Sequence, residues 1–277
     1  METFINAWQQ MPAHISPHLF SIGSFQLRYY SLMYIVAFVI VYFLVLYRIK
    51  HENYKYTAED IQDYLVWAMI GVLVGARLGD VLIYNFSYFA QHPLEIIIPF
   101  DFSNGVRFTG ISGMSYHGGL IGVIIMTILF CRKRKIDFWK FTDLLCPAIP
   151  LGYTFGRIGN FINGELFGRV TAVPWGMYFP LDPTHSLRHP SQLYEAMFEG
   201  IFLFIVLWLI RKKKRFDGFL VGMYICGYGL VRFIIEFFRE PDYMLGPISI
   251  GQFLCLLMML GGIALLIWRK NASSSPK

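Results

Sequence analysis

The chain has 277 residues, of which 56% are hydrophobic and only 15% are charged, and its mean hydropathy is +0.49. Because soluble domains carry about a quarter charged residues, this composition excludes an ordinary soluble enzyme and predicts an all-α polytopic membrane protein. The formal net charge is +6, but the basic residues stand in short clusters between apolar runs, which is typical of topology signals rather than of nucleic-acid binding.

Seven apolar runs are long enough to cross a hydrocarbon core about 30 Å thick. No short basic-then-apolar leader with a cleavage site precedes the first run, so we expect it to remain as a span. We therefore expect one integral-membrane domain over residues 1–277 with seven transmembrane helices. The runs cover residues 27–47, 62–84, 114–131, 141–160, 192–210, 218–238 and 249–268.

Basic clusters follow the first, third, fifth and seventh runs and contain every lysine of the chain. The preference for basic residues on the cytoplasmic side then places the N-terminus outside and the C-terminus in the cytoplasm. The two long outer loops, near 85–113 and 165–191, are expected to form a small extracytoplasmic head. Asn104-Gly105 is a turn signal for a short hairpin in the first of them.

Eight basic residues lie outside these clusters, and all are arginines in the outer half of the predicted spans or in the outer loops. A guanidinium group binds phosphate through two hydrogen bonds and stays charged when it is partly dehydrated. These arginines therefore predict a site for an anionic lipid headgroup. Ion pairs with nearby carboxylates, such as Arg77 with Asp80 and Arg232 with Glu236, are the alternative, and both interpretations can hold together. The eight are Arg28, Arg77, Arg107, Arg157, Arg169, Arg188, Arg232 and Arg239.

The segment Gly156–Arg169 is the most informative part of the chain. It follows an apolar run and places Arg157, Asn160, Glu165 and further polar residues among four glycines, Gly164 included. Ionisable groups at membrane depth are costly and are functional candidates by default, and glycines let a backbone or a ligand approach closely. A structural helix contact would explain the glycines but not the polar side chains.

His117 stands at the outer start of the third predicted span, in the segment Ser115–Gly119. The two glycines after it leave room around the imidazole, which is the side chain that titrates near neutral pH. His117 is therefore a candidate general base. A satisfied structural histidine is the alternative.

The sixth predicted span carries a polar stripe. Tyr228, Arg232, Glu236 and Arg239 are spaced four, four and three residues apart, so they share one helix face. A polar stripe inside a membrane span must face protein or water, and core packing alone rarely needs two arginines and a glutamate there.

The fifth predicted span begins at Pro190 and Ser191, a pattern typical of a helix start. Gln192, Glu195 and Glu199 then share a face. Gln192 is a candidate binding residue, whereas Glu195 is open to a simpler interpretation as a favourable charge in the first helical turn.

Tyr30 and Tyr34 lie one turn apart near the outer end of the first predicted span, where interfacial tyrosines are common. Tyr30 is a candidate for substrate contact, and Tyr34 fits the simpler interpretation better. Gly71, Gly75 and Gly79 form a face of small residues on the second span, which predicts close packing against another helix.

Several familiar catalytic motifs are absent from the sequence. It has no HExxH, GxSxG or P-loop pattern. The four cysteines lie in or beside apolar segments without a CxxC pair, so we expect neither disulfides nor zinc, and no metal or organic cofactor. The polar residues that remain suit a site that orients an anionic leaving group while another molecule supplies the nucleophile.

The motifs together resemble the bacterial prolipoprotein diacylglyceryl transferase family. The resemblance rests on Gly156–Arg169, Tyr116–Gly119, His189–Gln192 and the stripe from Tyr228 to Arg239, in order and spacing. The segment 29–34 also matches, with a serine at position 31 where the family pattern has glycine. The match runs from about position 20 to position 268, and the loop between positions 169 and 188 is short for the family.

The resemblance implies a reaction in the bacterial cytoplasmic membrane. A diacylglyceryl group passes from phosphatidylglycerol to the lipobox cysteine of a prolipoprotein signal peptide, which forms a thioether and releases glycerol phosphate. It gives weight to His117, Arg157 and Arg232 as catalytic residues. It also implies a set of binding residues, namely Tyr30, Asn160, Gly164, Tyr228 and Glu236. Four further binding candidates follow from their position in the sequence: Glu165, Gln192, Arg239 and Arg77.

Two other classes of protein remain open from the residues alone. A phospholipid transporter or flippase would also place arginines near one leaflet, but it predicts polar residues at both leaflets and inverted repeats, which this sequence lacks. An intramembrane protease would need a nucleophile or metal motif, and none is present.

Overall fold

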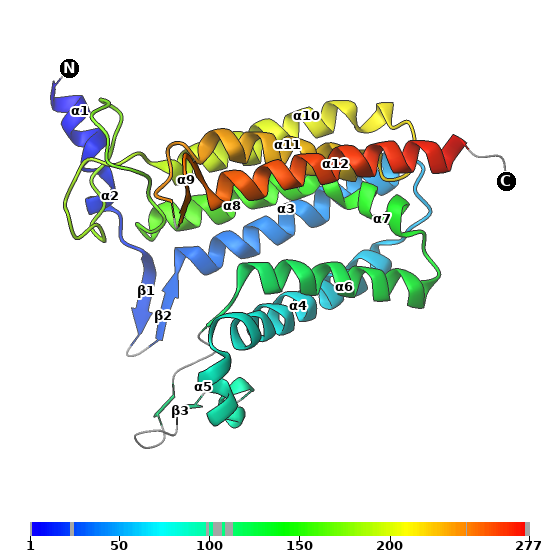
Figure 1. Ribbon diagram of the computed structural model, residues 1–277, viewed down its shortest axis with the longest axis horizontal. Coiled ribbons are helices and arrows are strands. Elements are labelled where there is room, and N and C mark those ends of the chain that lie inside the picture. Colours follow the sequence, from blue (N-terminus) through cyan, green and yellow to red (C-terminus); the bar gives the residue numbers. More distant parts are fainter. Residues whose placement is uncertain are drawn as a thin grey trace. The chain divides into compact units, whose positions relative to one another are not determined.

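The computed structural model describes residues 2–22, 25–97, 100–101, 107–108, 113–241 and 243–274. The protein is mostly helical (Figure 1). Its chain divides into two compact units: a first unit of Met1–Tyr54 with Thr142–Lys277, and a second unit of Lys55–Phe141.

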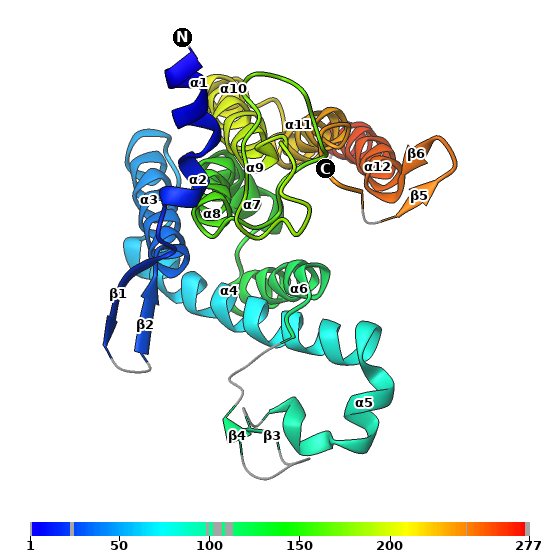
Figure 2. The same cartoon turned by 90° about the vertical axis from the view of Figure 1, so that its left-hand side faces the viewer.

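The first unit contains a short N-terminal pair of helices, a hairpin and a bundle of longer helices, in which α3 packs on α8 and α11 packs on α12 (Figure 2). The boundary between the units falls within helix α7, whose residues up to Phe141 belong to the second unit. The elements are α1 (Glu2–Gln9), α2 (Met11–His14), β1 (His18–Ile22), β2 (Phe25–Arg28), α3 (Tyr29–His51), α7 (Phe138–Leu145), α8 (Ile149–Ile162), α9 (Ser191–Glu195), α10 (Leu203–Ile210), α11 (Phe219–Ile235), β5 (Met244–Leu245), β6 (Ile248–Ser249) and α12 (Ile250–Ser274).

The second unit is built on two helices, α4 (Ala58–Gly79) and α6 (Tyr116–Arg134), with a short α5 (Phe86–Gln91) between them. Strands β3 (Phe100–Asp101) and β4 (Arg107–Phe108) pair antiparallel, as the hairpin prediction requires. The Asn104-Gly105 turn itself lies outside the described residues.

All seven apolar runs coincide with helical segments, and five of these are long and apolar enough to cross a membrane: Tyr29–His51, Ala58–Tyr84, Tyr116–Arg134, Ser191–Lys213 and Ile250–Ser274. The chain is therefore a multi-pass membrane protein. The other two segments are shorter or interrupted, so the seven-span arrangement stays a prediction.

Proline accounts for the interruption. A tight turn at Cys146–Ala148 separates α7 from α8. Pro147 and Pro150 have no backbone N–H to donate, and their rings clash with the preceding turn. Helix α8 consequently has only 14 residues. Helix α11 has 17 residues and falls just short of a typical span.

Side chains set several helix starts. Thr57 and Asp60 form a reciprocal capping box at the start of α4, and Ser115 accepts a hydrogen bond from the Gly118 backbone N–H at the start of α6. Helix α11 is capped from another element, because the Asp143 carboxylate accepts from the backbone N–H groups of Gly218 and Val221 at 2.8 and 3.0 Å. That bond joins α7 to α11.

The predicted close packing at the glycines of α4 is confirmed. A Cβ atom placed on Gly79 would lie 2.7 Å from the Cα of Gly118, and one on Gly71 would lie 2.8 Å from the carbonyl oxygen of Gly122. The two backbones therefore touch along this stripe of α4 and α6. Gly118, which the sequence analysis assigned to space around His117, serves this helix contact instead.

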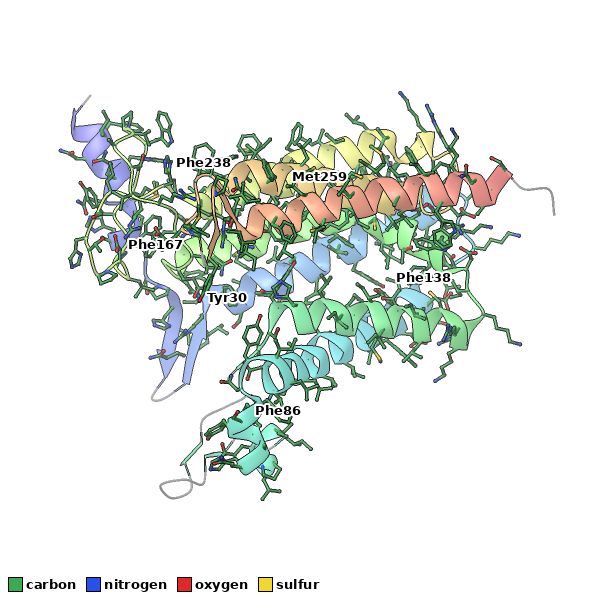
Figure 3. The ribbon with its side chains drawn as sticks, in the orientation of Figure 1. Tyr30, Phe86, Phe138, Phe167, Phe238 and Met259 are labelled. Carbon is green, nitrogen blue, oxygen red and sulfur yellow. The ribbon has the colours of Figure 1, made fainter. Side chains whose placement is uncertain are left out.

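The loop after α8 and the N-terminal helices form a small layer over one end of the first unit. Its core contains Phe161, Met177 and Phe179, with Trp8 and Phe167 packed against it; Phe167 is labelled in Figure 3. The indole N–H of Trp8 also donates to a carbonyl of the loop at 3.0 Å. The layer thus includes α1 and α2, which the sequence analysis did not predict. The 85–113 loop belongs to the second unit, so a head shared by both loops stays a prediction.

Arg188 holds this layer together. Its guanidinium donates to both oxygens of Asp182 at 2.8 and 3.0 Å and to Glu240 at 2.8 Å. The hydrogen bonds from Arg188 hold the pKa of the Asp182 carboxyl well below its usual range. This outer arginine therefore has a structural partner, and the ion-pair interpretation holds for it.

Candidate active site

A cluster of charged and polar side chains lies inside the first unit, where α8, α9, the helical turn Ala196–Phe202 and α11 meet. We call it the arginine–glutamate cluster. Its members come from three stretches of sequence that are far apart. They are Tyr153, Arg157, Glu195, Glu199, Arg232, Glu236 and Arg239.

Glu195 is the centre of this cluster. One of its carboxylate oxygens, Oε2, lies 2.6 Å from Arg157 Nε and 3.3 Å from Arg232 Nη1, and the other lies 2.5 Å from Arg239 Nη1. The Glu195 side chain is 0% exposed. A buried carboxylate is tolerated only when it is paired, and here three arginines share it.

Glu199 and Tyr153 also contact the arginines of the cluster. The Tyr153 hydroxyl donates to Glu199 Oε2 at 2.5 Å and accepts from Arg157 Nε at 2.6 Å. The other Glu199 oxygen lies 3.4 Å from Arg232 Nη1. Glu195 directly precedes the π-helical segment Ala196–Phe202, and Glu199 lies within it; such local widening of a helix is frequent at functional sites.

The residues of the predicted stripe lie close together, but their common helix face extends only as far as Glu236. Helix α11 ends at Ile235 with Glu236 as its C-cap, and Arg239 lies beyond the helix, in an isolated β-bridge with Gly168. Glu236 Oε2 lies 3.3 Å from Arg232 Nη2 and 3.4 Å from Arg239 Nε, and the hydroxyl of Ser249 donates to its other oxygen at 3.0 Å. The ring of Tyr228 packs edge-on against Tyr153, with 6.0 Å between ring centroids.

The cluster is balanced in charge, since three arginines face three glutamates. The two groups differ in exposure, however. The side chains of Arg157, Arg232 and Arg239 are 14–17% exposed, whereas those of Glu195 and Glu199 are 0% exposed. The arginine side chains are therefore mostly buried but keep some exposed surface, whereas the two carboxylates are fully enclosed. Ion pairing of Arg232 with Glu236, the alternative weighed above, is confirmed.

A group of amides continues the cluster along α8. Arg157 Nη1 donates to Asn160 Oδ1 at 3.2 Å, and Asn160 Nδ2 donates to Glu165 Oε1 at 2.8 Å. Gln192 donates to the backbone carbonyl of Glu165 at 2.6 Å. Hydrogen bonds thus link the predicted catalytic residue Arg157 with three predicted binding residues. These hydrogen bonds fix the orientation of the Asn160 amide.

Tyr30 lies beside these hydrogen-bonded residues, at the start of α3 (labelled in Figure 3). Its hydroxyl is 3.0 Å from that of Tyr34, and Asn160 and Glu165 are its polar neighbours on α8 and the following loop. A Cβ atom on Gly159 would lie 3.0 Å from the Tyr30 ring. Gly159 therefore allows α3 and α8 to approach closely here.

Two other glycines of this segment have different roles. Gly164 has φ +70° in the turn after α8, a conformation that favours glycine, so the backbone explains this residue without a ligand. Gly156 is different, because a Cβ atom there would meet nothing within 4 Å. The space beside Arg157 is therefore open on that side.

His117 and Arg77 belong to the second unit, where their described contacts are local. The His117 ring packs edge-on against Tyr116. Arg77 donates to the backbone carbonyls of Ile96 and Glu95 and pairs with Asp80 at 3.9 Å, which confirms the predicted ion pair. That these two residues join the arginine–glutamate cluster stays a prediction.

Tyr153 was not predicted as a member of the cluster, and the central positions of Glu195 and Glu199 were not predicted either. Tyr153 stands one helical turn before Arg157, and that spacing was a usable signal. Glu195 and Glu199 stand in an apolar span, where buried charge itself indicates a partner. Among the described residues, no group of three or more His, Cys, Asp or Glu side chains is placed to hold a metal ion.

Fold and site together define a multi-pass membrane protein whose helices bury a cluster of three arginines and three glutamates. The chain matches the family described as prolipoprotein diacylglyceryl transferase over residues 17–268. It therefore belongs to this family of transferases.

Curated relatives support this assignment across nearly the whole chain. Each of three is named phosphatidylglycerol–prolipoprotein diacylglyceryl transferase. The protein of Chlorobaculum tepidum is 55% identical over 99% of this chain and 97% of its own length. Those of Campylobacter hominis and Campylobacter curvus are 44% and 45% identical, over 98% and 96% of this chain and 97% and 99% of their own lengths.

Proposed function

We propose that this transferase holds the phosphate of phosphatidylglycerol against the arginine–glutamate cluster and passes the diacylglyceryl group to a prolipoprotein cysteine. The thiol sulfur attacks the glyceryl carbon, a C–S bond forms, and the C–O bond to the phosphate breaks. The products are a thioether-linked lipid and glycerol phosphate, and the thiol proton leaves the sulfur in the same process. The site lies in a bacterial cytoplasmic membrane.

The arginines carry the harder part of this chemistry. Expelling a phosphate ester builds negative charge on the leaving oxygen, and preorganised donors stabilise such charge most effectively where water is excluded. Arg157 and Arg232 come from different helices and are held by Glu195 at 2.6 and 3.3 Å. This shared anchoring of two partly exposed arginine side chains is the observation that supports the proposal best.

The nucleophile comes from the second substrate, the lipobox of the signal peptide. A free thiol has a pKa of about 8.5, so modest help from a base or a positive field is enough to form the thiolate. We assign that help to His117. Tyr30, Asn160 and Glu165 would then contact the lipid or the peptide beside the arginines.

The proposal is tested with purified protein, radiolabelled phosphatidylglycerol and a lipobox peptide. Arg157→Lys and Arg232→Lys keep the charge but lose the planar fork of donors. Each should lower kcat by about 10²-fold or more, the cost of removing one donor to a developing oxyanion. Near-normal turnover in both variants would rule out phosphate recognition by these arginines.

The same assay distinguishes the transporter alternative. A lipid transporter would move the labelled phospholipid between leaflets and leave the peptide unmodified. Label that appears on the peptide in the wild type and is absent from a cysteine-to-serine peptide supports the transferase reaction.

A further inference from the structure

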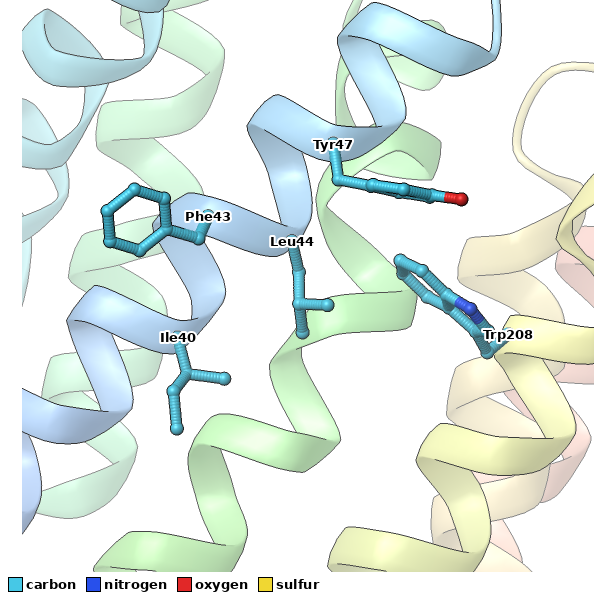
Figure 4. A pocket seen from close by; sticks show the side chains of 5 residues that line it. All are labelled: Ile40, Phe43, Leu44, Tyr47 and Trp208. Carbon is cyan, nitrogen blue, oxygen red and sulfur yellow. The ribbon is translucent and has the colours of Figure 1, made fainter.

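An open apolar groove lies between α3 and α10, away from the arginine–glutamate cluster (Figure 4). Its volume is about 380 Å³, within the range of about 300–1,000 Å³ that is typical of ligand sites. Four of its residues form one stripe on α3 and Trp208 faces them from α10. The lining residues are Ile40, Phe43, Leu44, Tyr47 and Trp208.

This groove is distinct from the proposed donor site. Tyr30, beside the cluster, begins α3, whereas Leu44 lies 14 residues further along the same helix. At 1.5 Å per residue the two are about 21 Å apart along the helix axis. A lipid in the groove is therefore a second ligand rather than another part of the substrate.

Two of the three aromatic rings of the groove, those of Tyr47 and Trp208, each contact a basic side chain. The Arg211 guanidinium lies 3.9 Å from the centroid of the Trp208 ring, and the His51 ring stacks on Tyr47 at 4.2 Å. Arg211 is in turn fixed by Glu52 at 2.8 Å. One end of the groove is thus formed by two pairs, Trp208 with Arg211 and Tyr47 with His51. In each pair the aromatic ring lines the groove and the basic side chain lies against that ring.

The surroundings of this end are strongly basic. Lys50 follows Tyr47 by three residues and Lys212 follows Trp208 by four, so each lysine lies one turn beyond a ring of the groove. Lys50, Lys212 and Lys213 are exposed. The nearby carboxylates already have partners. Arg48 and Arg211 share Glu52 at 2.7 and 2.8 Å, and Lys214 pairs with Asp143 and Asp217.

We propose that the groove binds one acyl chain of an anionic phospholipid whose phosphate rests against Lys50, Lys212 and Lys213. The occupant follows from the environment, because both walls belong to helices long and apolar enough to span the membrane. An open apolar groove on such a wall faces lipid chains. The exposed lysines add selection for an anionic headgroup, and Tyr47 and Trp208 lie at the level where aromatic residues meet headgroups.

The test uses Trp208 as the reporter of its own groove. The protein is reconstituted in phosphatidylcholine vesicles that contain increasing fractions of either dibrominated phosphatidylserine or dibrominated phosphatidylcholine. Bromine quenches tryptophan fluorescence on contact. The difference between wild type and Trp208→Phe isolates the signal of this position, and Phe keeps an apolar ring in the groove.

Quenching at Trp208 should favour phosphatidylserine over phosphatidylcholine by about fivefold. The triple variant Lys50→Gln, Lys212→Gln, Lys213→Gln should bring this ratio to about one. A matched triple variant in the second unit, Lys133→Gln, Lys135→Gln, Lys140→Gln, removes the same net charge and should leave the ratio unchanged.

Three results would overturn the inference. Equal quenching by the two lipids in the wild type would mean ordinary lipid contact without headgroup selection. A preference that survives the Lys50, Lys212, Lys213 substitutions would place its origin elsewhere. No quenching of Trp208 by either lipid would mean that another occupant, such as a second copy of the chain, covers the groove.

Discussion

At the scale of single residues, Glu195 has the least replaceable position. Its two oxygens contact Arg157, Arg232 and Arg239 at 2.5–3.3 Å. An arginine that binds a ligand in only one orientation needs a fixed partner on its other side, and Glu195 supplies that partner to all three. We regard it as a positioning residue.

Glu195→Gln should lower kcat by about 10²-fold, because small displacements of positioning groups have effects of that size. The substitution removes one negative charge beside three arginines, so attraction for the lipid phosphate persists and KM for the lipid should stay the same or fall. Steady-state kinetics at several lipid concentrations measures both constants. Glu240→Gln, at an exposed carboxylate, is the matched control and should behave as the wild type.

A purely structural role of Glu195 predicts a different pattern. The variant would then lose folded protein, and the fraction that remains would have normal kcat. Active-site titration of the folded fraction separates the two cases.

His117 is the other residue whose role can be tested by itself. General-base assistance contributes about 10²–10⁴-fold, so His117→Gln should be severely impaired near pH 7. Activity should recover in part as the pH rises toward the pKa of the substrate thiol, about 8.5, because the thiolate then forms without help. Initial rates between pH 6.5 and 9 measure this recovery.

A well-folded His117→Gln variant that is equally impaired across this range would contradict the base assignment. The chemistry would then rest on stabilisation of the leaving group by Arg157 and Arg232. The wild type, assayed at each pH, corrects for the behaviour of the peptide thiol itself.

At the scale of elements, the layer formed by the loop after α8 and the N-terminal helices contains a histidine that links pH to stability. The Nδ1 atom of His189 lies 3.1 Å from the Tyr194 hydroxyl, and its ring packs against Phe238. Burial lowers the pKa of His189. The folded state therefore binds this proton more weakly than the unfolded state does, whose histidine pKa is about 6.5.

The contribution of the neutral His189 side chain to the free energy of unfolding is consequently complete above about pH 6.5 and is lost as the pH falls through and below that value. Asp182 adds no slope in this range, because its lowered pKa affects stability only below the ordinary carboxyl pKa of about 3.9. The unfolding temperature of the purified protein should fall from pH 7.5 to pH 5, and that of His189→Gln should change less. Parallel curves for the two proteins would argue against a titrating His189.

The helices show how far the sequence predicts this structure. Apolar runs and the spacing of Tyr228, Arg232 and Glu236 predict where α11 lies and which face is polar, because both depend on local periodicity. The contacts of Glu195 with α8 and α11 depend on tertiary packing, which leaves no periodic signal. Helices α1 and α2 were missed for the same reason, since they are short and stabilised mainly by contacts such as Trp8 with the loop after α8.

At the scale of the whole molecule, the open question is how often the chain crosses the membrane. Five segments meet the length and hydropathy of a span, while α8 and α11 are shorter, with 14 and 17 residues. Both shorter helices carry arginines of the cluster. A span that includes ionised groups must surround them with protein or water, and the buried partners Glu195 and Glu199 do this.

We therefore expect seven crossings, with the N-terminus outside and the lysine-rich loops in the cytoplasm. In a cysteine-free background, a cysteine introduced at Asn104 should react with a membrane-impermeant maleimide added to intact cells. One introduced at Lys213 should react only after the membrane is permeabilised. The four native cysteines are unpaired, and three of them are buried, so replacing them should disturb the fold little. The third, fourth and fifth predicted spans separate the two positions, so they should lie on opposite sides of the membrane. Labelling of Lys213→Cys in intact cells, or protection of Asn104→Cys there, would therefore contradict the seven-span arrangement.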